Sequence, residues 1–158
     1  SVHNRRMEAL TLFGLGRAHG ELGDVTGALR WHAAAHGLFQ NLGRDIDGME
    51  NEACVALCQA KLGQGIEALA VVGALLDGVE GSAANLPASA TIGLRWTCQQ
   101  VLDKLGDKRM EPVLAQLHVD IQRRAAELTE VADRDRLIQA IPTFRGIVAS
   151  YKQQGAAP

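Results

Sequence analysis

Apolar side chains recur at helical spacing along most of the chain, and Leu-Gly pairs or polar turn residues interrupt the pattern. The pattern predicts helices near residues 3–22, 25–42, 45–62, 65–79, 87–105 and 108–128, followed by a final element from Asp133. Pro142 falls inside that last element, where it removes a backbone donor, so we expect a kink or a helix that restarts with Pro142 in its first turn. The sequence therefore predicts an all-α protein.

Three Leu-Gly pairs close successive helices of this pattern, at Leu22-Gly23, Leu62-Gly63 and Leu105-Gly106, with spacings of 40 and 43 residues. Glycine readily takes the left-handed conformation beyond a helix end, and the leucine before it can pack back on the helix. The Asp or Gln after each pair can start the next helix. The repeated pair predicts helix hairpins of similar construction.

The unit from residue 9 to residue 42 sets small and large residues at helical spacing. Gly16 and Ala28 would let the two helices of a hairpin approach closely, and His19 and His32 would fill the gaps around them. This unit resembles a tetratricopeptide repeat, a family that prefers aromatic residues at the two histidine positions and a period of ~34 residues. Further units span about 45–79 and 87–128.

The resemblance implies antiparallel helix hairpins stacked as a short right-handed superhelix, with residues 1–153 as one domain. A capping helix is expected at 133–153 and a disordered tail at 154–158. The segment from Gly78 to Asn85 is expected to be the only long loop, with Asn85 as a helix cap and Pro87 in the next first turn. The abrupt start and the weakly structured end lead us to expect a piece of a longer protein.

The stretch from Trp96 to Tyr151 carries a second resemblance. Its segments at 105–107, 135–137 and 141–147 are similar to the C-terminal repeats of large bacterial multidomain signalling ATPases and transcriptional regulators. Such repeats serve there as a sensor or docking arm. The resemblance implies a bacterial interaction module that carries no catalytic residue of its own.

The first helix of each hairpin in such a stack lines the concave face. Counting back from the three Leu-Gly pairs selects a row of groove residues, namely Phe13, Arg17, Glu21, Ala53, Leu57, Lys61, Trp96, Gln100 and Lys104. Two aromatic side chains flanked by cations suit an extended peptide with apolar and acidic positions. Packing of Phe13, Leu57 and Trp96 between hairpins is an equally weighted interpretation, and both stay open.

Composition narrows the class of partner. The net charge is −2 with acids and bases mixed along the chain, so no basic face is available for nucleic acid. No apolar run reaches the ~20 residues that a membrane span needs, and residues 1–8 lack the order of a signal peptide. We therefore expect a cytoplasmic chain that binds a protein, a peptide or other domains of the same polypeptide.

Two motifs resemble ligand sites on inspection. The glycine-rich run from Gly14 to Gly20 lies inside a helical pattern, whereas a dinucleotide loop follows a strand and opens a helix, so we expect close helix packing. His32 and His36 stand one turn apart, the spacing of a metal-binding pair, and His19 could add a third ligand. Because His19 and His32 hold the large packing positions, core filling is the favoured interpretation, and no metal or other cofactor is expected.

The remaining reactive groups give no enzyme signature. Cys54 and Cys58 share a helix face and could form a soft metal or redox site with Cys98, although buried apolar filling is commoner for cysteine. The carboxyl pairs Glu127/Glu130 and Asp133/Asp135 lie in arginine-rich turns and are expected to make solvated helix-end interactions.

Binding rather than catalysis is therefore the predicted function, and the main hypothesis places a peptide or a partner domain in the concave groove. One alternative is a structural spacer or self-association arm, which would form a homodimer through exposed apolar ends. Another is a small-molecule sensor pocket between hairpins, lined by Cys54, Cys58 and Trp96.

Overall fold

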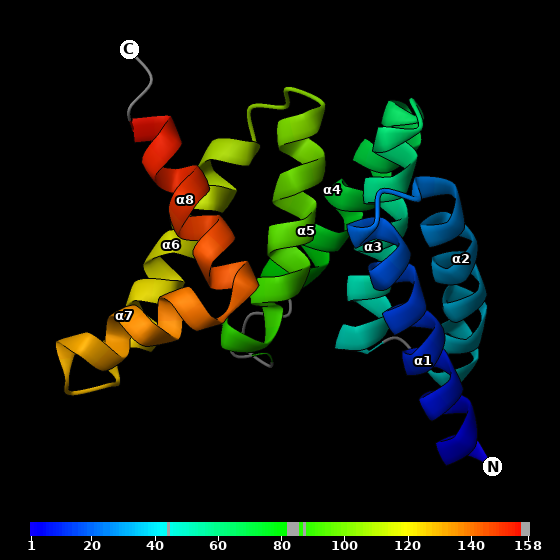
Figure 1. Cartoon of the computed structure of the whole chain (residues 1–158). Coiled ribbons are helices and arrows are strands. Elements are labelled where there is room, and N and C mark those ends of the chain that lie inside the picture. Colours follow the sequence, from blue (N-terminus) through cyan, green and yellow to red (C-terminus); the bar gives the residue numbers. More distant parts are fainter. Residues whose placement is uncertain (44, 82–85, 87, 156–158) are drawn as a thin grey trace.

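The computed structural model describes residues 1–43, 45–81, 86 and 88–155, and every regular element within these ranges is helical (Figure 1). In chain order the elements are α1 (Val2–Glu21), α2 (Val25–Leu42), α3 (Ile46–Lys61), α4 (Gly65–Gly81), η1 (Ala88–Thr91), α5 (Ile92–Lys104), α6 (Met110–Ala126), α7 (Val131–Ala140) and α8 (Pro142–Gly155). The prediction of an all-α chain is confirmed.

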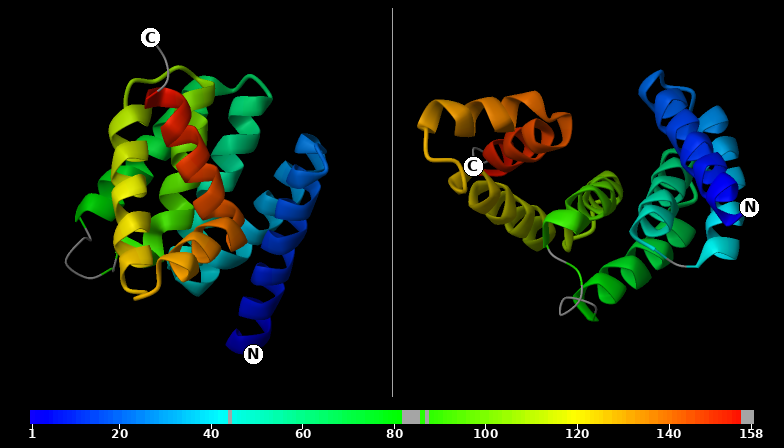
Figure 2. Two further views of the ribbon diagram at one scale, coloured as in Figure 1. Left: turned by 60° about the vertical axis from the view of Figure 1, so that its left-hand side comes forward. Right: turned by 90° about the horizontal axis from the view of Figure 1, so that it is seen from below.

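The helices follow one another along an open arc, with the two termini on opposite arms (Figures 1 and 2). α1 packs on α2, α3 on α4 and α5 on α6, and the short connections within these pairs reverse the direction of the chain (Figure 1). α3 also contacts α2 and α5, so it joins the first pair to the third. The last two helices pack on each other and on α6.

The three Leu-Gly pairs end α1, α3 and α5 in the same way. Gly23, Gly63 and Gly106 have φ angles of 81°, 86° and 66°, the left-handed region that glycine enters without steric cost. After each pair a backbone N–H donates to a carbonyl of the preceding helix: Asp24 to His19 (3.0 Å), Gln64 to Gln59 (2.9 Å) and Asp107 to Leu102 (2.9 Å). The predicted glycine turns are thereby confirmed, with the hydrogen-bond pattern of a Schellman motif.

The leucines of these turns differ in burial: Leu105 is partly buried and packs against the core, whereas Leu22 and Leu62 are exposed. The prediction that Leu22 packs back on its helix is wrong, because 84% of its surface is exposed. Leu62 is 44% exposed. Asp24 does cap α2, because its side chain accepts a hydrogen bond from the Gly27 N–H at 2.9 Å. The turn geometry therefore depends on the glycine and the backbone bonds rather than on burial of the leucine.

The two helices of the first hairpin approach closely at Gly16, which has no side chain. A Cβ built on Gly16 would lie 2.6 Å from Cε1 of His32, so the imidazole occupies the space that a side chain would need. Ala28 is fully buried in the same interface, whereas His19 is only half-buried and contacts Asp24. The expected pairing of small residues with the large His32 is confirmed.

The core is divided into three clusters along the arc. The first joins α1 to α2 around Phe13 and Phe39. The second lies between α3, α4 and α5 around Leu75, Leu94 and Leu102, and the third lies between α5, α6, α7 and α8 around Leu117. Each cluster is formed by helices that are close in sequence, so the fold depends mainly on local association.

The structure departs from the predicted boundaries in two places. α4 continues to Gly81, so the expected loop does not begin at Gly78, while Asn85 and Pro87 lie outside the described residues. The expectation of a single capping helix at 133–153 is wrong, because two helices occupy this segment: α7 ends at Ala140 and α8 begins at Pro142. Proline disfavours the helical conformation for the residue before it, and Ile141 is accordingly extended. The predicted restart at Pro142 is confirmed. The disordered tail expected from residue 154 is wrong at its start, because α8 continues to Gly155, while residues 156–158 lie outside the described part.

Candidate functional site

A cavity of about 310 Å³ opens where α1, α2, α3 and α5 face the start of α8. We call it the groove. Its lining residues are Gly16, Arg17, Gly20, Glu21, Val25, Ala28, His32, Glu50, Cys54, Leu57, Cys58, Lys61, Gly93, Trp96, Thr97, Gln100, Pro142 and Thr143. The first helix of each of the three pairs contributes one wall, so residues distant in sequence face a common space.

The structure brings together most of the residues selected by their place in the repeat. Those that line the groove are Arg17, Glu21, Leu57, Lys61, Trp96 and Gln100. They lie on α1, α3 and α5 at intervals of four residues, and that interval keeps side chains on one face of a helix. The convergence follows from the three helices presenting equivalent faces to the same side.

Three members of the predicted row lie elsewhere. Phe13 is only 8% exposed and packs in the first core cluster, with its ring at 6.5 Å from that of Phe39. Ala53 is fully buried in the second cluster. Lys104 is exposed at the end of α5 and does not line the groove. For Phe13 the structure favours packing between helices, because α1 turns this position toward α2.

Trp96 and Leu57 combine both interpretations that the sequence left open. Trp96 lines the groove, and its ring also packs on α8, where a Cβ built on Gly146 would lie 3.1 Å from Cζ2. Leu57 lines the groove and packs against the second core cluster. Neither side chain is fully buried. Each therefore offers one edge to the groove while the rest is fixed by its neighbours.

Arg17 is an exposed cation that lines the groove. Its guanidinium carbon lies 5.9 Å from the centroid of the Phe13 ring, within cation–π range. Burial lowers the pKa of His32, which the charge of Arg17 lowers further while the hydrogen bond to Asn51 opposes the shift. Both burial and the charge of Arg17 therefore favour the neutral form of His32.

Glu50 is a groove residue that the sequence reasoning missed. It is half-buried, and a Cβ built on Gly93 would lie 2.9 Å from its Oε1. Burial raises the pKa of this carboxyl, Arg17 opposes the rise, and Asp47 adds to it. The four-residue row on α3 continues from Ala53 to Met49, so counting along that row does not reach Glu50.

The cysteines line or border the groove without being activated. Cys54 and Cys58 line it, whereas Cys98 is fully buried behind it. Burial raises the pKa of Cys54 and of Cys98 to about 12, and it also raises the pKa of Cys58. The thiolate is the reactive form, so at neutral pH Cys54 and Cys58 act as apolar lining and Cys98 as part of the core.

The histidines that suggested a metal pair have other partners. His32 Nδ1 lies 2.9 Å from Asn51 Oδ1, and the Asn51 amide donates to the His32 carbonyl at 2.9 Å, which links α2 to α3. His36 contacts Gln40 at 2.8 Å. Within the described ranges, no three His, Cys, Asp or Glu side chains are grouped so that they could hold a metal ion.

The carboxyl pairs near α7 make surface ion pairs. Glu127 bonds Arg124 at 3.0 Å and Asp133 bonds Arg136 at 3.0 Å, with all four side chains at least half exposed. Pairs of this kind contribute little to stability individually. Their position at helix ends agrees with the solvated role expected from the sequence.

Comparisons with known proteins supply no function for this chain, so the fold and the groove are the basis for proposing one. No protein-family model, curated protein or solved structure matches this chain. None of the helices in the described part of the chain is both long enough and apolar enough to cross a bilayer.

Proposed function

We propose that the chain is a binding module built as a tetratricopeptide-like stack of three hairpins, α1–α2, α3–α4 and α5–α6, with α7 and α8 as its cap. The observation that carries the proposal is the convergence of six residues, chosen only from their place in the repeat, around one groove. A stack that repeats the same helix face along its length presents such a surface to an extended ligand.

The proposed occupant is an extended peptide segment with apolar and acidic side chains. Arg17 and Lys61 supply cations at two points of the groove, and Trp96 and Leu57 supply apolar edges. Glu21 and Glu50 add acids, which would disfavour a uniformly acidic peptide and select for a mixed sequence. A few aromatic and cationic anchors commonly supply most of the binding energy in such sites.

The similarity of residues 96–151 to the repeats of bacterial regulators supports a wider proposal. In it, this module serves a signalling protein or a transcriptional regulator as a docking or sensing arm. The partner is then a segment of another protein or of another domain of the same polypeptide.

The test is selection of peptides from a random displayed library on the intact chain, followed by affinity measurement on charge-reversed variants. We expect Arg17→Glu/Lys61→Glu to weaken the selected peptides by at least ~10-fold, equivalent to ~1.4 kcal/mol. Lys104→Glu/Lys108→Glu makes the same charge change at exposed positions outside the groove and should leave the affinity within a factor of ~2.

Circular dichroism of both variants provides the folding control. A library that yields no peptide, or equal weakening by both charge-reversed variants, would contradict binding in the groove.

A second candidate is favoured by one observation. Cys54, Cys58 and Trp96, which the sequence placed in a small-molecule sensor pocket, all line this same groove. A small apolar ligand would then replace the peptide. The library distinguishes the two, because a small-molecule site selects no peptide yet changes the fluorescence of Trp96 when a compound binds, and Trp96→Phe removes that signal.

A further inference from the structure

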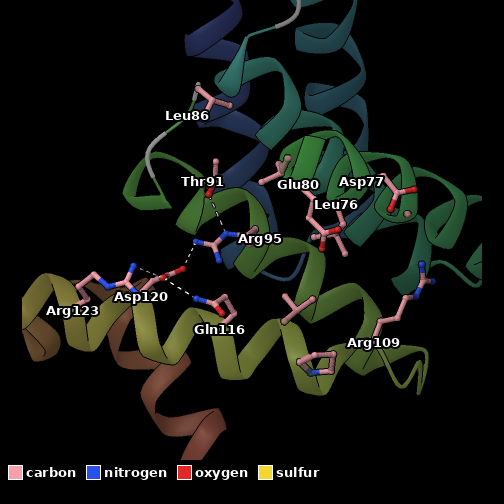
Figure 3. Close-up of a pocket in the computed structure, with 14 residues that line it drawn as sticks. Leu76, Asp77, Glu80, Leu86, Thr91, Arg95, Arg109, Gln116, Asp120 and Arg123 are labelled. Atoms are coloured by element: carbon pink, nitrogen blue, oxygen red, sulfur yellow. Dashed lines mark hydrogen bonds and ion pairs between the residues drawn. The ribbon is translucent and has the colours of Figure 1, made fainter. Parts of the chain in front are cut away.

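A second cavity, of about 580 Å³, lies between α4 and α6 over the start of α5 (Figure 3). It shares only α5 with the groove, and on that helix Thr97 and Gln100 face the groove whereas Arg95 faces the second cavity. Its size falls within the ~300–1,000 Å³ that is typical of sites for small molecules. The two cavities can therefore be tested separately. Failure to find a peptide for the groove would leave the proposal for the second cavity unaffected.

A buried ion pair forms one end of this cavity. Arg95 Nη2 donates to Asp120 Oδ2 at 2.7 Å, and the two side chains are only 11% and 5% exposed. Arg95 Nε also donates to the Thr91 hydroxyl at 3.0 Å, and Gln116 donates to the second Asp120 oxygen at 3.1 Å. Charges are costly to bury unless hydrogen bonds hold them, so this end is a fixed polar surface.

The two walls carry opposite charges. Figure 3 shows Asp77 and Glu80 on the α4 side and Arg109 and Arg123 on the α6 side. Arg109 is held by Asp107 at 2.8 Å. Arg123 is 69% exposed, and its nearest ion-pair contact in the described residues is Asp120 at 3.7 Å. Arg123 is therefore the more exposed cation of this wall and the one with the longer ion-pair contact, which leaves it better placed than Arg109 to meet a ligand.

The surface between these charges is apolar. Leu76 and Val79 from α4 face Pro112 and Val113 from α6. An apolar lining with a few convergent polar groups is the usual construction of a small-molecule site. The cavity thus offers a cation on one side, acids on the other and an aliphatic floor between them.

We propose that this cavity binds a small zwitterion whose two charges stand at opposite ends of an apolar body, the chemistry of a short peptide of apolar residues. The ligand carboxylate pairs with Arg123 beside the fixed Arg95–Asp120 end, and the ammonium group faces Glu80 on α4. The apolar body lies on Leu76 and Val113. A ligand with a single charge would leave one wall without a counter-ion, so recognition requires both charges.

Calorimetric titration of the intact chain tests the proposal with L-leucyl-L-leucine and L-leucyl-L-leucyl-L-leucine as probes. We expect at least one of them to bind with a Kd below about 1 mM. N-acetyl-L-leucyl-L-leucine lacks the ammonium group and L-leucyl-L-leucinamide lacks the carboxylate, and each should bind at least ~10-fold more weakly than the unmodified peptides. L-leucine carries both charges on one carbon and should also bind at least ~10-fold more weakly, so equal affinity for leucine would contradict recognition by two opposite walls.

Substitutions in the two charged walls test where the ligand binds. Arg123→Gln and Glu80→Gln should each weaken the bound probe by ~10-fold, a loss of ~1.4 kcal/mol. Arg124→Gln is the matched control, since Arg124 is the next residue on α6, pairs with Glu127 and does not line the cavity. The proposal is overturned if neither peptide binds at about 10 mM. Equal affinity of Arg123→Gln and Arg124→Gln, or full affinity for the singly charged probes, would also overturn it.

Discussion

The hairpin α1–α2 and the C-terminal group α6–α8 bury their helices by different means. In the hairpin, Gly16 leaves room for the His32 ring, and fully buried alanines at 9, 28 and 35 hold the two helices close. In the C-terminal group, branched aliphatic side chains such as Leu117, Ile121 and Ile147 fill the interface. The distance between α1 and α2 is thus small because glycine and alanine side chains leave room for close approach. The distance between the helices of the C-terminal group is determined by the volume of their aliphatic side chains. Added atoms should damage the first region, and removed atoms the second.

The largest expected effect is loss of volume in the C-terminal group. Leu117→Ala should lower the free energy of unfolding by ~2–5 kcal/mol, because Leu117 is fully buried and the substitution leaves a cavity. Urea denaturation followed by circular dichroism measures the change. Val119→Ala, on the same helix but 48% exposed, is the control and should change stability by less than ~1 kcal/mol. An equal effect of the two substitutions would show that α6 is not buried on the Leu117 side.

A smaller effect of opposite origin is expected in the hairpin. Gly16→Ala should destabilise the chain by ~1–3 kcal/mol, because its Cβ would overlap the His32 ring. Gly14→Ala, two residues earlier on α1, has nothing within 4 Å of the added Cβ and should stabilise the helix by ~0.5–1 kcal/mol. Thermal unfolding of both variants gives the two signs. Stabilisation by Gly16→Ala would break the comparison, because it would mean that the helices are not closely apposed there.

The smallest expected effect is on pH dependence. Burial lowers the pKa of His32 in the folded chain below its ordinary value of about 6.5. The unfolded chain therefore takes up the proton first as pH falls through that value, so His32 contributes stability above it that is lost on acidification. The unfolding free energy of the wild type should fall more steeply between about pH 7.5 and about pH 5 than that of His32→Gln. Parallel curves for the two proteins would show that the pKa of His32 does not differ between the folded and the unfolded chain.

Local features of the fold could be predicted from the sequence. The three glycine turns depend on residues adjacent in sequence, and Pro142 acts on its own helix and on Ile141. The contact between Gly16 and His32 was also predictable, because a short turn at Gly23 fixes how the two helices meet. Such features need only the geometry of one hairpin.

Features that depend on contacts between hairpins could not be predicted to the same degree. Phe13 lies four residues before Arg17 on α1, but its side chain packs toward α2. Counting back from Gly23 does not reveal which positions of α1 face α2. Arg95 and Asp120 are 25 residues apart, and in sequence each resembles an ordinary surface charge. Their burial follows only from how α5 packs on α6. The groove position of Glu50 likewise depends on the approach of Gly93 from another helix.

α5 lines both cavities, with Trp96 on the side of the groove and Arg95 on the side of the second cavity. A helix moves largely as a rigid body, so a shift that repositions one of these side chains also repositions the other. Ligands in the two cavities that favour different positions of α5 would be thermodynamically linked, and linkage requires each to change the affinity of the other by the same factor. The shared helix would thus make occupancy of one cavity measurable as a change in affinity at the other.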